Sequence, residues 1–114
     1  MSTRDDRKTT FDEAKNWVRT FCEDRDWDPY HSPKDLAIGL VTEASELLEL
    51  FRFVSEKDQT ALMSDPVARE KMGDELADSL YFVLRMAQMY GFDLSECLAK
   101  KIEKNAVRYP PLRR

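Results

Sequence analysis

The scarcity of turn-forming residues constrains this chain more than any other feature of its sequence. Its 114 residues include three glycines and five prolines, and each proline lies where a helix can begin or end. Between these points, apolar residues recur every three or four positions, which is typical of amphipathic helices. The sequence therefore predicts an all-α protein, with residues 1–114 forming a single domain.

Capping residues predict where the first two helices begin. Thr10 and Glu13 form a capping-box pattern, and the helix that follows should run to about Asp24. Ser32 before Pro33 predicts the second start, because serine caps the first amides and proline lacks the amide that would stay unpaired. The apolar stripe of this second helix contains Leu36, Leu40, Leu47, Leu50 and Val54.

The third predicted helix is the most apolar part of the chain. Asp65 and Pro66 repeat the start signal, and Gly91 supplies a stop, so the helix should cover about 66–90. Residues 81–90 are apolar nearly all round, and a helix of this kind is normally enclosed on every side. Four short helices of one subunit cannot enclose it, so the sequence predicts an oligomer.

A fourth helix should follow a cap at Asp93, and the prolines Pro110 and Pro111 should close the fold. The helix carries an apolar stripe of Leu94, Leu98 and Ile102. Residues 55–65 are polar and show no period, so they are predicted to form a loop with room for one short turn. The expected architecture is a four-helix bundle.

Composition excludes several classes of function. The net charge is −4, which disfavours a nucleic acid polymer as partner. Charged residues make up 35% of the chain and leave no apolar stretch long enough to span a membrane. Two cysteines cannot form a disulfide framework, so a cytoplasmic location is expected. One small basic cluster, suited to a phosphate ligand, contains Lys100, Lys101, Lys104, Arg108, Arg113 and Arg114.

Two pairs of acidic residues stand out because they fall on apolar-patterned helices. Glu43 and Glu46 are three residues apart in the second predicted helix, as are Glu75 and Asp78 in the third. Residues with this spacing are neighbours on one helix face, so the like charges repel. Glu43 also lies on the apolar stripe, where a carboxylate needs a proton, a basic partner or a metal.

Two interpretations of these acids remain open from the residues alone. Acidic residues on helices are usually solvated surface. If the two helices pack antiparallel, however, all four carboxylates can converge, and oxygen-only ligands suit Mg²⁺ or Mn²⁺. A di-iron or zinc site is disfavoured because the chain has a single histidine, His31, which lies outside both helices.

The two acidic pairs, in this order, resemble the signature of the all-α nucleoside triphosphate pyrophosphohydrolases, the MazG-like superfamily. The sequence is most similar to the dCTP pyrophosphatase branch, over about residues 10–110. Phe53 stands where some members carry tryptophan. The segments that carry the resemblance beyond the acids are Arg25 to Pro33, Glu43 to Phe53 and Lys101 to Pro110.

The resemblance implies hydrolysis of a nucleoside triphosphate, with dCTP preferred and others tolerated, to the monophosphate and pyrophosphate. It implies a Mg²⁺ site, also suited to Mn²⁺, made by Glu43, Glu46, Glu75 and Asp78. It favours Glu46 as general base, although the residues alone do not separate ligand from base. It further implies a homotetramer built as a dimer of dimers. The residues expected to contact substrate are Trp27, His31, Phe53, Phe82, Lys101, Asn105, Arg108 and Tyr109.

Several of these residues also have a purely structural interpretation. Trp27 and His31 can pack the corner before the second helix, and Phe82 can belong to the core. Lys101 and Arg108 can be a solvated helix end favoured by the helix dipole. Two rival functions follow: a non-catalytic helical interaction module, and a superfamily member acting on dUTP or a phosphoribosyl nucleotide.

Overall fold

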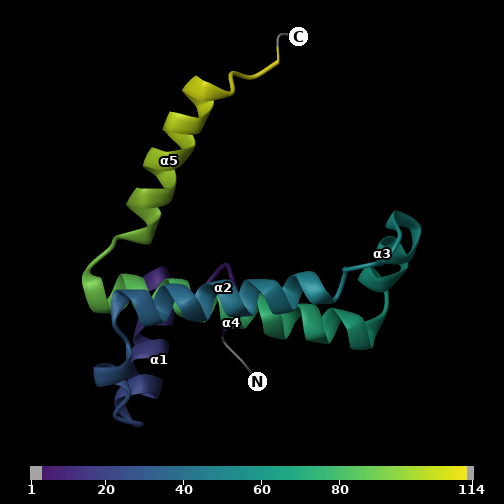
Figure 1. Cartoon of the computed structure of the whole chain (residues 1–114). Coiled ribbons are helices and arrows are strands. Elements are labelled where there is room, and N and C mark those ends of the chain that lie inside the picture. Colours follow the sequence, from purple (N-terminus) through teal and green to yellow (C-terminus); the bar gives the residue numbers. More distant parts are fainter. Residues whose placement is uncertain (1–3, 113–114) are drawn as a thin grey trace.

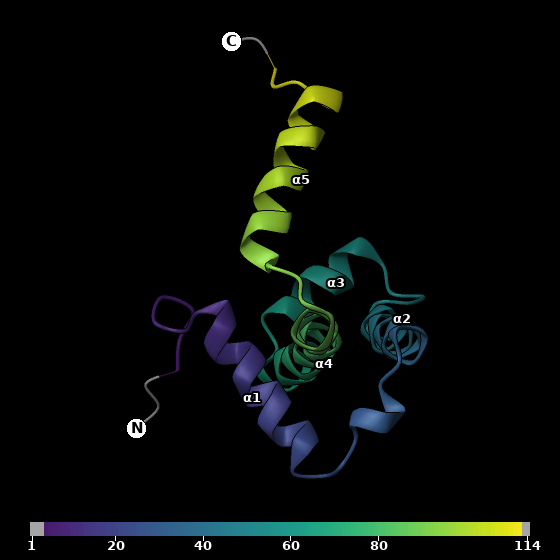
Figure 2. The ribbon, with the colours of Figure 1, turned by 90° about the vertical axis from the view of Figure 1, so that its left-hand side faces the viewer.

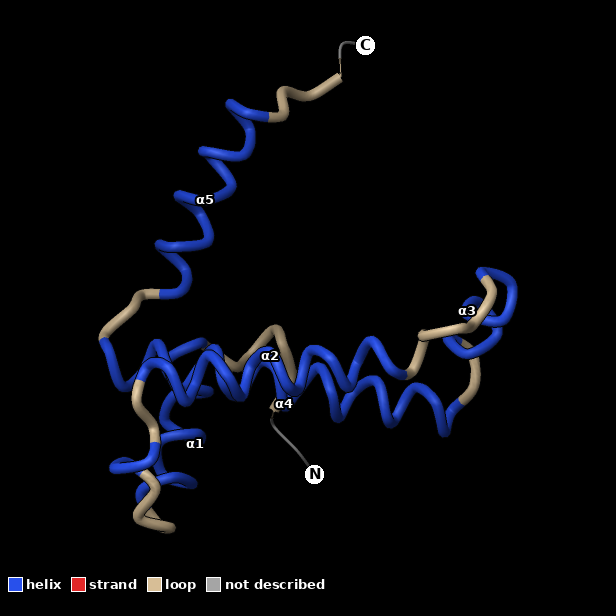
Figure 3. Tube along the Cα trace, viewed as in Figure 1, coloured by secondary structure: helices blue, strands red, loops and turns tan. Residues whose placement is uncertain are grey.

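A computed structural model describes residues 4–112, and this part of the chain is helical with no strand (Figure 3). Arg113 and Arg114 of the basic cluster lie outside the described residues. The elements are α1 (Phe11–Glu23), the 3₁₀ turn η1 (Asp28–Tyr30), α2 (Pro33–Glu49), α3 (Glu56–Met63), α4 (Pro66–Tyr90) and α5 (Leu94–Arg108).

The predicted capping residues begin their helices as expected. The Thr10 hydroxyl accepts a hydrogen bond from the amide of Glu13 at 3.1 Å. Ser32 and Asp35 form a reciprocal capping box at the start of α2. The side chains of Asp65 and Asp93 cap α4 and α5 in the same manner. Gly91 ends α4 with a φ of 76°, a left-handed conformation that favours glycine.

The prediction of a loop over residues 55–65 is wrong, because most of it forms α3. The hydroxyl of Ser55 accepts a hydrogen bond from the amide of Asp58 at 3.2 Å and so caps this helix. Within α3 only Gln59 and Leu62 are half-buried, so the apolar signal is too sparse to show a helical period. The described chain therefore has five α-helices where the sequence predicted four.

Helix α2 ends before the last residues of the apolar stripe that was predicted for it. Leu50 is the C-terminal cap of α2, and Val54 lies beyond the helix. Phe53 adopts a positive φ of 62°, which turns the chain toward α3. The amide of Val54 donates to the carbonyl of Phe51 at 3.1 Å, as in a turn.

Helices α2 and α4 run antiparallel along their length and form the centre of the molecule, while α1 crosses α4 (Figures 1 and 2). A small core of Val18, Cys22 and Leu84 joins α1 to α4. Gly39 allows a close approach on the other side of α4, since a Cβ atom there would lie 2.3 Å from the ring of Phe82. The antiparallel packing that the carboxylates require is therefore present.

Helix α5 does not pack into a bundle with the other helices but leads away from them (Figure 1). The radius of gyration is 17.1 Å, whereas a compact domain of this length has about 13 Å. The apolar side chains of Leu98 and Ile102 are more than half exposed. The single chain thus lacks the compact four-helix bundle that was predicted. Within residues 4–112, no helix is both long and apolar enough to cross a membrane.

Candidate active site

The packing of α2 on α4 brings three of the four predicted metal ligands together. Carboxylate oxygens of Glu43, Glu75 and Asp78 lie within 4.8 Å of one another. Glu43 and Glu75 are half-buried, and Asp78 is exposed. Each helix carries its acidic residues on one face, so the antiparallel packing of α2 and α4 brings acids of both helices into one cluster.

Glu46 lies outside this group of three but interacts with two of its members. A hydrogen bond with Glu46, together with burial, raises the pKa of Glu43 to about 7. Burial and then a hydrogen bond with Glu46 raise the pKa of Glu75. Negative charges on the neighbouring acids act in the same direction for both groups. The cluster therefore resists full ionisation when it contains only protein atoms.

Two oxygens in the cluster are buried without a partner. Oε2 of Glu43 and Oε2 of Glu75 receive no hydrogen bond from any residue of the described chain. An unpaired buried carboxylate oxygen is costly, and a hard divalent cation satisfies it. The donors are all oxygens, which suits Mg²⁺ or Mn²⁺ rather than zinc. The residues present thus fit the metal that the sequence predicted.

A pocket of about 320 Å³ adjoins these acids. Aromatic rings make most of its wall, and two of the rings meet edge to face, with the centroids of Phe21 and Trp27 5.6 Å apart. An apolar pocket with few polar groups is typical of a small-molecule site. Its lining residues are Phe21, Trp27, His31, Glu43, Asp78, Tyr81 and Phe82.

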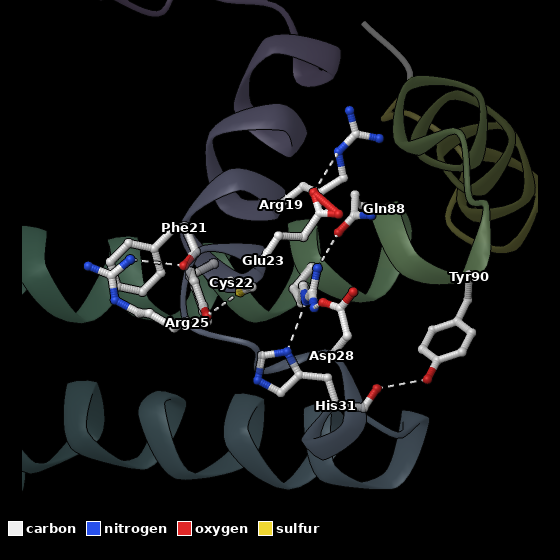
Figure 4. Close-up of polar contacts among 11 residues, drawn as sticks. Arg19, Phe21, Cys22, Glu23, Arg25, Asp28, His31, Gln88 and Tyr90 are labelled. Atoms are coloured by element: carbon white, nitrogen blue, oxygen red, sulfur yellow. Dashed lines mark hydrogen bonds and ion pairs between the residues drawn. The ribbon is translucent and has the colours of Figure 1, made fainter.

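The loop before α2 carries Trp27 and His31 into this pocket, and α4 holds the loop in place. Nε of Arg85 donates to Nδ1 of His31 at 2.9 Å, and the hydroxyl of Tyr90 donates to the His31 carbonyl at 2.7 Å. Arg85 also forms an ion pair with Asp28. Figure 4 shows Asp28 and His31 turned toward this part of α4.

Sequence reasoning missed Phe21, Tyr81 and Arg85. The available signal for Arg85 was its position as the only charged residue in the apolar run 81–90. Such a charge is buried only when partners satisfy it, and its partner Asp28 is 57 positions away in sequence. Phe21 and Tyr81 carry no signal that separates a pocket wall from a core residue.

Five of the predicted substrate contacts lie away from the pocket in the single chain. Phe53 follows the end of α2 and is 94% exposed, with the guanidinium of Arg52 4.9 Å from its ring centroid. The other four are all exposed and lie on α5 or directly after it. They are Lys101, Asn105, Arg108 and Tyr109. Helix α5 leads away from α2 and α4 (Figure 2).

Comparison with known proteins identifies the family. The sequence pattern of the MazG-like family matches residues 38–112, which include both acidic pairs. The chain belongs to the MazG-like family. Its structure is also similar to that of a pyrophosphatase from Archaeoglobus fulgidus, with a TM-score of 0.82 and 27% identity, covering 97% of this chain and 99% of that one.

Curated relatives of this MazG-like chain include dCTP pyrophosphatase 1 from mouse and from human. The mouse protein is 31% identical over 101 residues, which are 89% of this chain and 59% of the relative. The human protein is 30% identical over 101 residues, which again are 89% of this chain and 59% of the relative. The chain thus spans less than two thirds of the length of these relatives.

The raised pKa of Glu43 predicts how the metal-free MazG-like chain responds to pH. Its pKa moves from an ordinary 4.5 to about 7, so between these values the folded chain binds more protons than the unfolded chain. The free energy of unfolding should therefore fall as pH rises from 4.5 to 7 in the presence of a chelator. Glu43→Gln removes this titration and should be more stable than the parent at pH 7.

Thermal melts of the parent and Glu43→Gln over this pH range measure the difference directly. Glu70→Gln is the control, because Glu70 is exposed on α4 and outside the cluster. Its melting curve should follow that of the parent at every pH. Parallel pH profiles for the parent and Glu43→Gln would contradict the assignment of a strained acidic cluster.

Proposed function

We propose that the chain hydrolyses nucleoside triphosphates between the α and β phosphates and releases the monophosphate and pyrophosphate. The observation that carries this proposal is the position of the acidic cluster beside the aromatic pocket, with Glu43 and Asp78 common to both. A triphosphate bound to metal at the acids can place its nucleoside among the rings. The names of these similar proteins, dCTP pyrophosphatase 1 and pyrophosphatase, support this reaction class.

In this proposal, Glu43, Glu75 and Asp78 hold Mg²⁺, with Mn²⁺ as a substitute. The bound ion would offset the negative charge of the triphosphate oxygens and orient them. Glu46 lies outside the converging group of three and is exposed to solvent. It is therefore our candidate for both a further ligand and the general base that takes a proton from the attacking water.

The aromatic pocket supports a nucleoside as the ligand. Trp27 and Phe82 offer ring faces or edges to a base, and stacking contributes about 1–3 kcal/mol per base while discriminating little between bases. The name of the relatives, dCTP pyrophosphatase 1, supports our proposal of dCTP as the preferred substrate. The weak discrimination by stacking supports cleavage of other deoxynucleotides as well, and we propose that ribonucleotides are cleaved more slowly. dUTP is the competing substrate to test, because stacking on the rings does not distinguish one pyrimidine from the other.

The phosphate contacts proposed for α5 require a second copy of the chain. All four predicted contacts on or after α5 are exposed, and α5 leads away from α2 and α4 of its own chain (Figure 1). They are Lys101, Asn105, Arg108 and Tyr109. The same helix exposes Leu98 and Ile102. An apolar groove between α2, α4 and the first turn of α5 includes Leu40, Val83 and Met86. We propose a homotetramer, a dimer of dimers, in which α5 packs on other subunits and completes their pockets.

The acidic cluster predicts a large loss of activity on neutralisation. Each of the changes Glu43→Gln, Glu46→Gln, Glu75→Gln and Asp78→Asn should lower kcat at least ~10²-fold, the scale of losing an electrostatic contact in a transition state. None of the four should unfold the chain, because each removes repulsion. Pyrophosphate release with Mg²⁺, alongside a thermal melt, measures both effects.

Asp74→Asn is the matched control, since Asp74 is exposed on α4, the helix that carries Glu75 and Asp78, and lies outside the cluster. It should keep near-parental activity. The same assay with a panel of nucleotides, with and without Mg²⁺, ranks dCTP against dUTP and the ribonucleotides. A parent chain that releases no pyrophosphate from any of them would favour the rival, a non-catalytic interaction module.

The exposed stripe on α5 predicts that the assembly can be broken without unfolding the subunit. Ile102→Asp places a charge on a side chain that is 58% exposed in the single chain, so it should leave helices α1 to α4 folded. Light scattering should report a tetramer for the parent and a smaller mass for the variant at micromolar concentration. Glu103→Gln, next to it on the exposed helix, should stay tetrameric; a monomeric parent would refute the proposed assembly.

A further inference from the structure

Arg85 is the one buried charged side chain in the described chain, with a fractional exposure of 1%. It lies in the apolar part of α4, at a position where an aliphatic residue would be expected. A buried guanidinium is stable only when its donors are matched by acceptors in fixed directions. The acceptors that surround Arg85 therefore indicate its role.

Each arm of the Arg85 guanidinium contacts a different residue. One terminal nitrogen pairs with the carboxylate of Asp28, and the other donates to Oε1 of Gln88 at 2.6 Å. The remaining Nε donates to Nδ1 of His31 at 2.9 Å. Asp28 and Gln88 thus hold the guanidinium in place, and the Nε donor is left for the imidazole of His31.

This contact determines which nitrogen of His31 carries the proton. The arginine Nε–H can only donate, so Nδ1 of His31 must accept and cannot itself hold a proton. A neutral imidazole with an unprotonated Nδ1 carries its proton on Nε2. The doubly protonated, cationic form would lose the contact and place two positive groups together.

The surroundings of the ring favour the neutral form as well. Burial, followed by the positive charge of Arg85, lowers the pKa of His31, against smaller opposing effects of Asp28 and Asp35. The backbone of His31 is fixed separately, because Tyr90 donates to its carbonyl. The ring and the backbone of this pocket residue therefore have independent anchors on α4.

We propose that Arg85 is a positioning residue that keeps His31 as a neutral Nε2–H donor in the nucleotide pocket. The inference rests on the proposed function for the identity of the ligand. A neutral donor matches a lone pair on the nucleobase, such as the O2 or N3 atom of cytosine, whereas a phosphate would be better served by a cation. The contact with Arg85 therefore favours the nucleobase, rather than a phosphate, as the group that His31 binds. This polar contact can distinguish between bases, which stacking on aromatic rings does poorly.

Nitrogen NMR of the histidine ring tests the proposal in the unmodified chain of 114 residues. His31 is the only histidine of the 114 residues, so a ¹⁵N-histidine-labelled, tag-free sample gives one ring to observe. The expected spectrum at pH 7 has an unprotonated Nδ1 and a protonated Nε2, which differ widely in chemical shift. A ring with its proton on Nδ1, or with both nitrogens protonated, would overturn the proposal whatever the variants do.

Variants separate control of the ring from simple support of the fold. Arg85→Met removes the donor to Nδ1, and the ring should become a mixture of tautomers or gain a second proton. Tyr90→Phe removes the other tie to His31 but leaves the ring contact, so its spectrum should match that of the parent. If Arg85→Met does not fold, Arg85→Leu also removes every donor to Nδ1 and should change the tautomer in the same way. An unchanged tautomer in the folded variant would refute the proposal.

Kinetics provide the second measurement. Arg85→Met should raise KM for dCTP by about 3- to 10-fold, the scale of one hydrogen bond, with little change in kcat. In a His31→Gln background, whose amide donor has no tautomer, Arg85→Met should change KM less than about 2-fold. Equal effects in both backgrounds would refute the proposal. Absence of hydrolysis by the parent would refute the proposed function alone, since the spectrum still decides what Arg85 does to His31.

Discussion

Repulsion among the carboxylates of α2 and α4 is the interaction on which the rest of the site depends. The antiparallel helices bring oxygens of Glu43, Glu75 and Asp78 within 4.8 Å of one another. Oε2 of Glu43 and Oε2 of Glu75 are buried with no hydrogen-bond partner among residues 4–112. A fold selected for stability alone would place a basic or apolar residue here, so the cost is explained by a ligand that supplies positive charge.

The same helix pair also organises the aromatic pocket beside the acids. Gly39 lets α2 approach the ring of Phe82, and Arg85 and Tyr90 of α4 hold the loop that carries His31. Helix α4 thus positions both the acids and the aromatic loop, because it packs closely on α2 and forms hydrogen bonds and an ion pair with the loop that contains η1. A ligand that spans both regions would bridge charged and aromatic ends, as a nucleotide does.

Local chemistry made part of this architecture predictable from sequence. Capping residues act over three or four positions, so Thr10, Ser32 and Asp65 marked their helices correctly, and the acidic pairs followed from helical spacing. Helix α3 was missed because it buries little and shows no apolar period. The burial of Arg85 depends on Asp28, far away in sequence, and the position of α5 depends on what packs against it. Neither can be inferred from neighbouring residues.

The central claim is that the clustered carboxylates bind a cation and lose protons when they do so. Measurement of the protons released on metal binding tests this claim most directly. Calorimetric titration of the chain with Mn²⁺ at pH 7, in two buffers of different ionisation enthalpy, measures the protons released. Glu43 has a pKa of about 7 without metal, so binding should release a fraction of a proton, and Glu43→Gln should reduce that fraction. Binding without proton release, or no binding at all, would contradict the account.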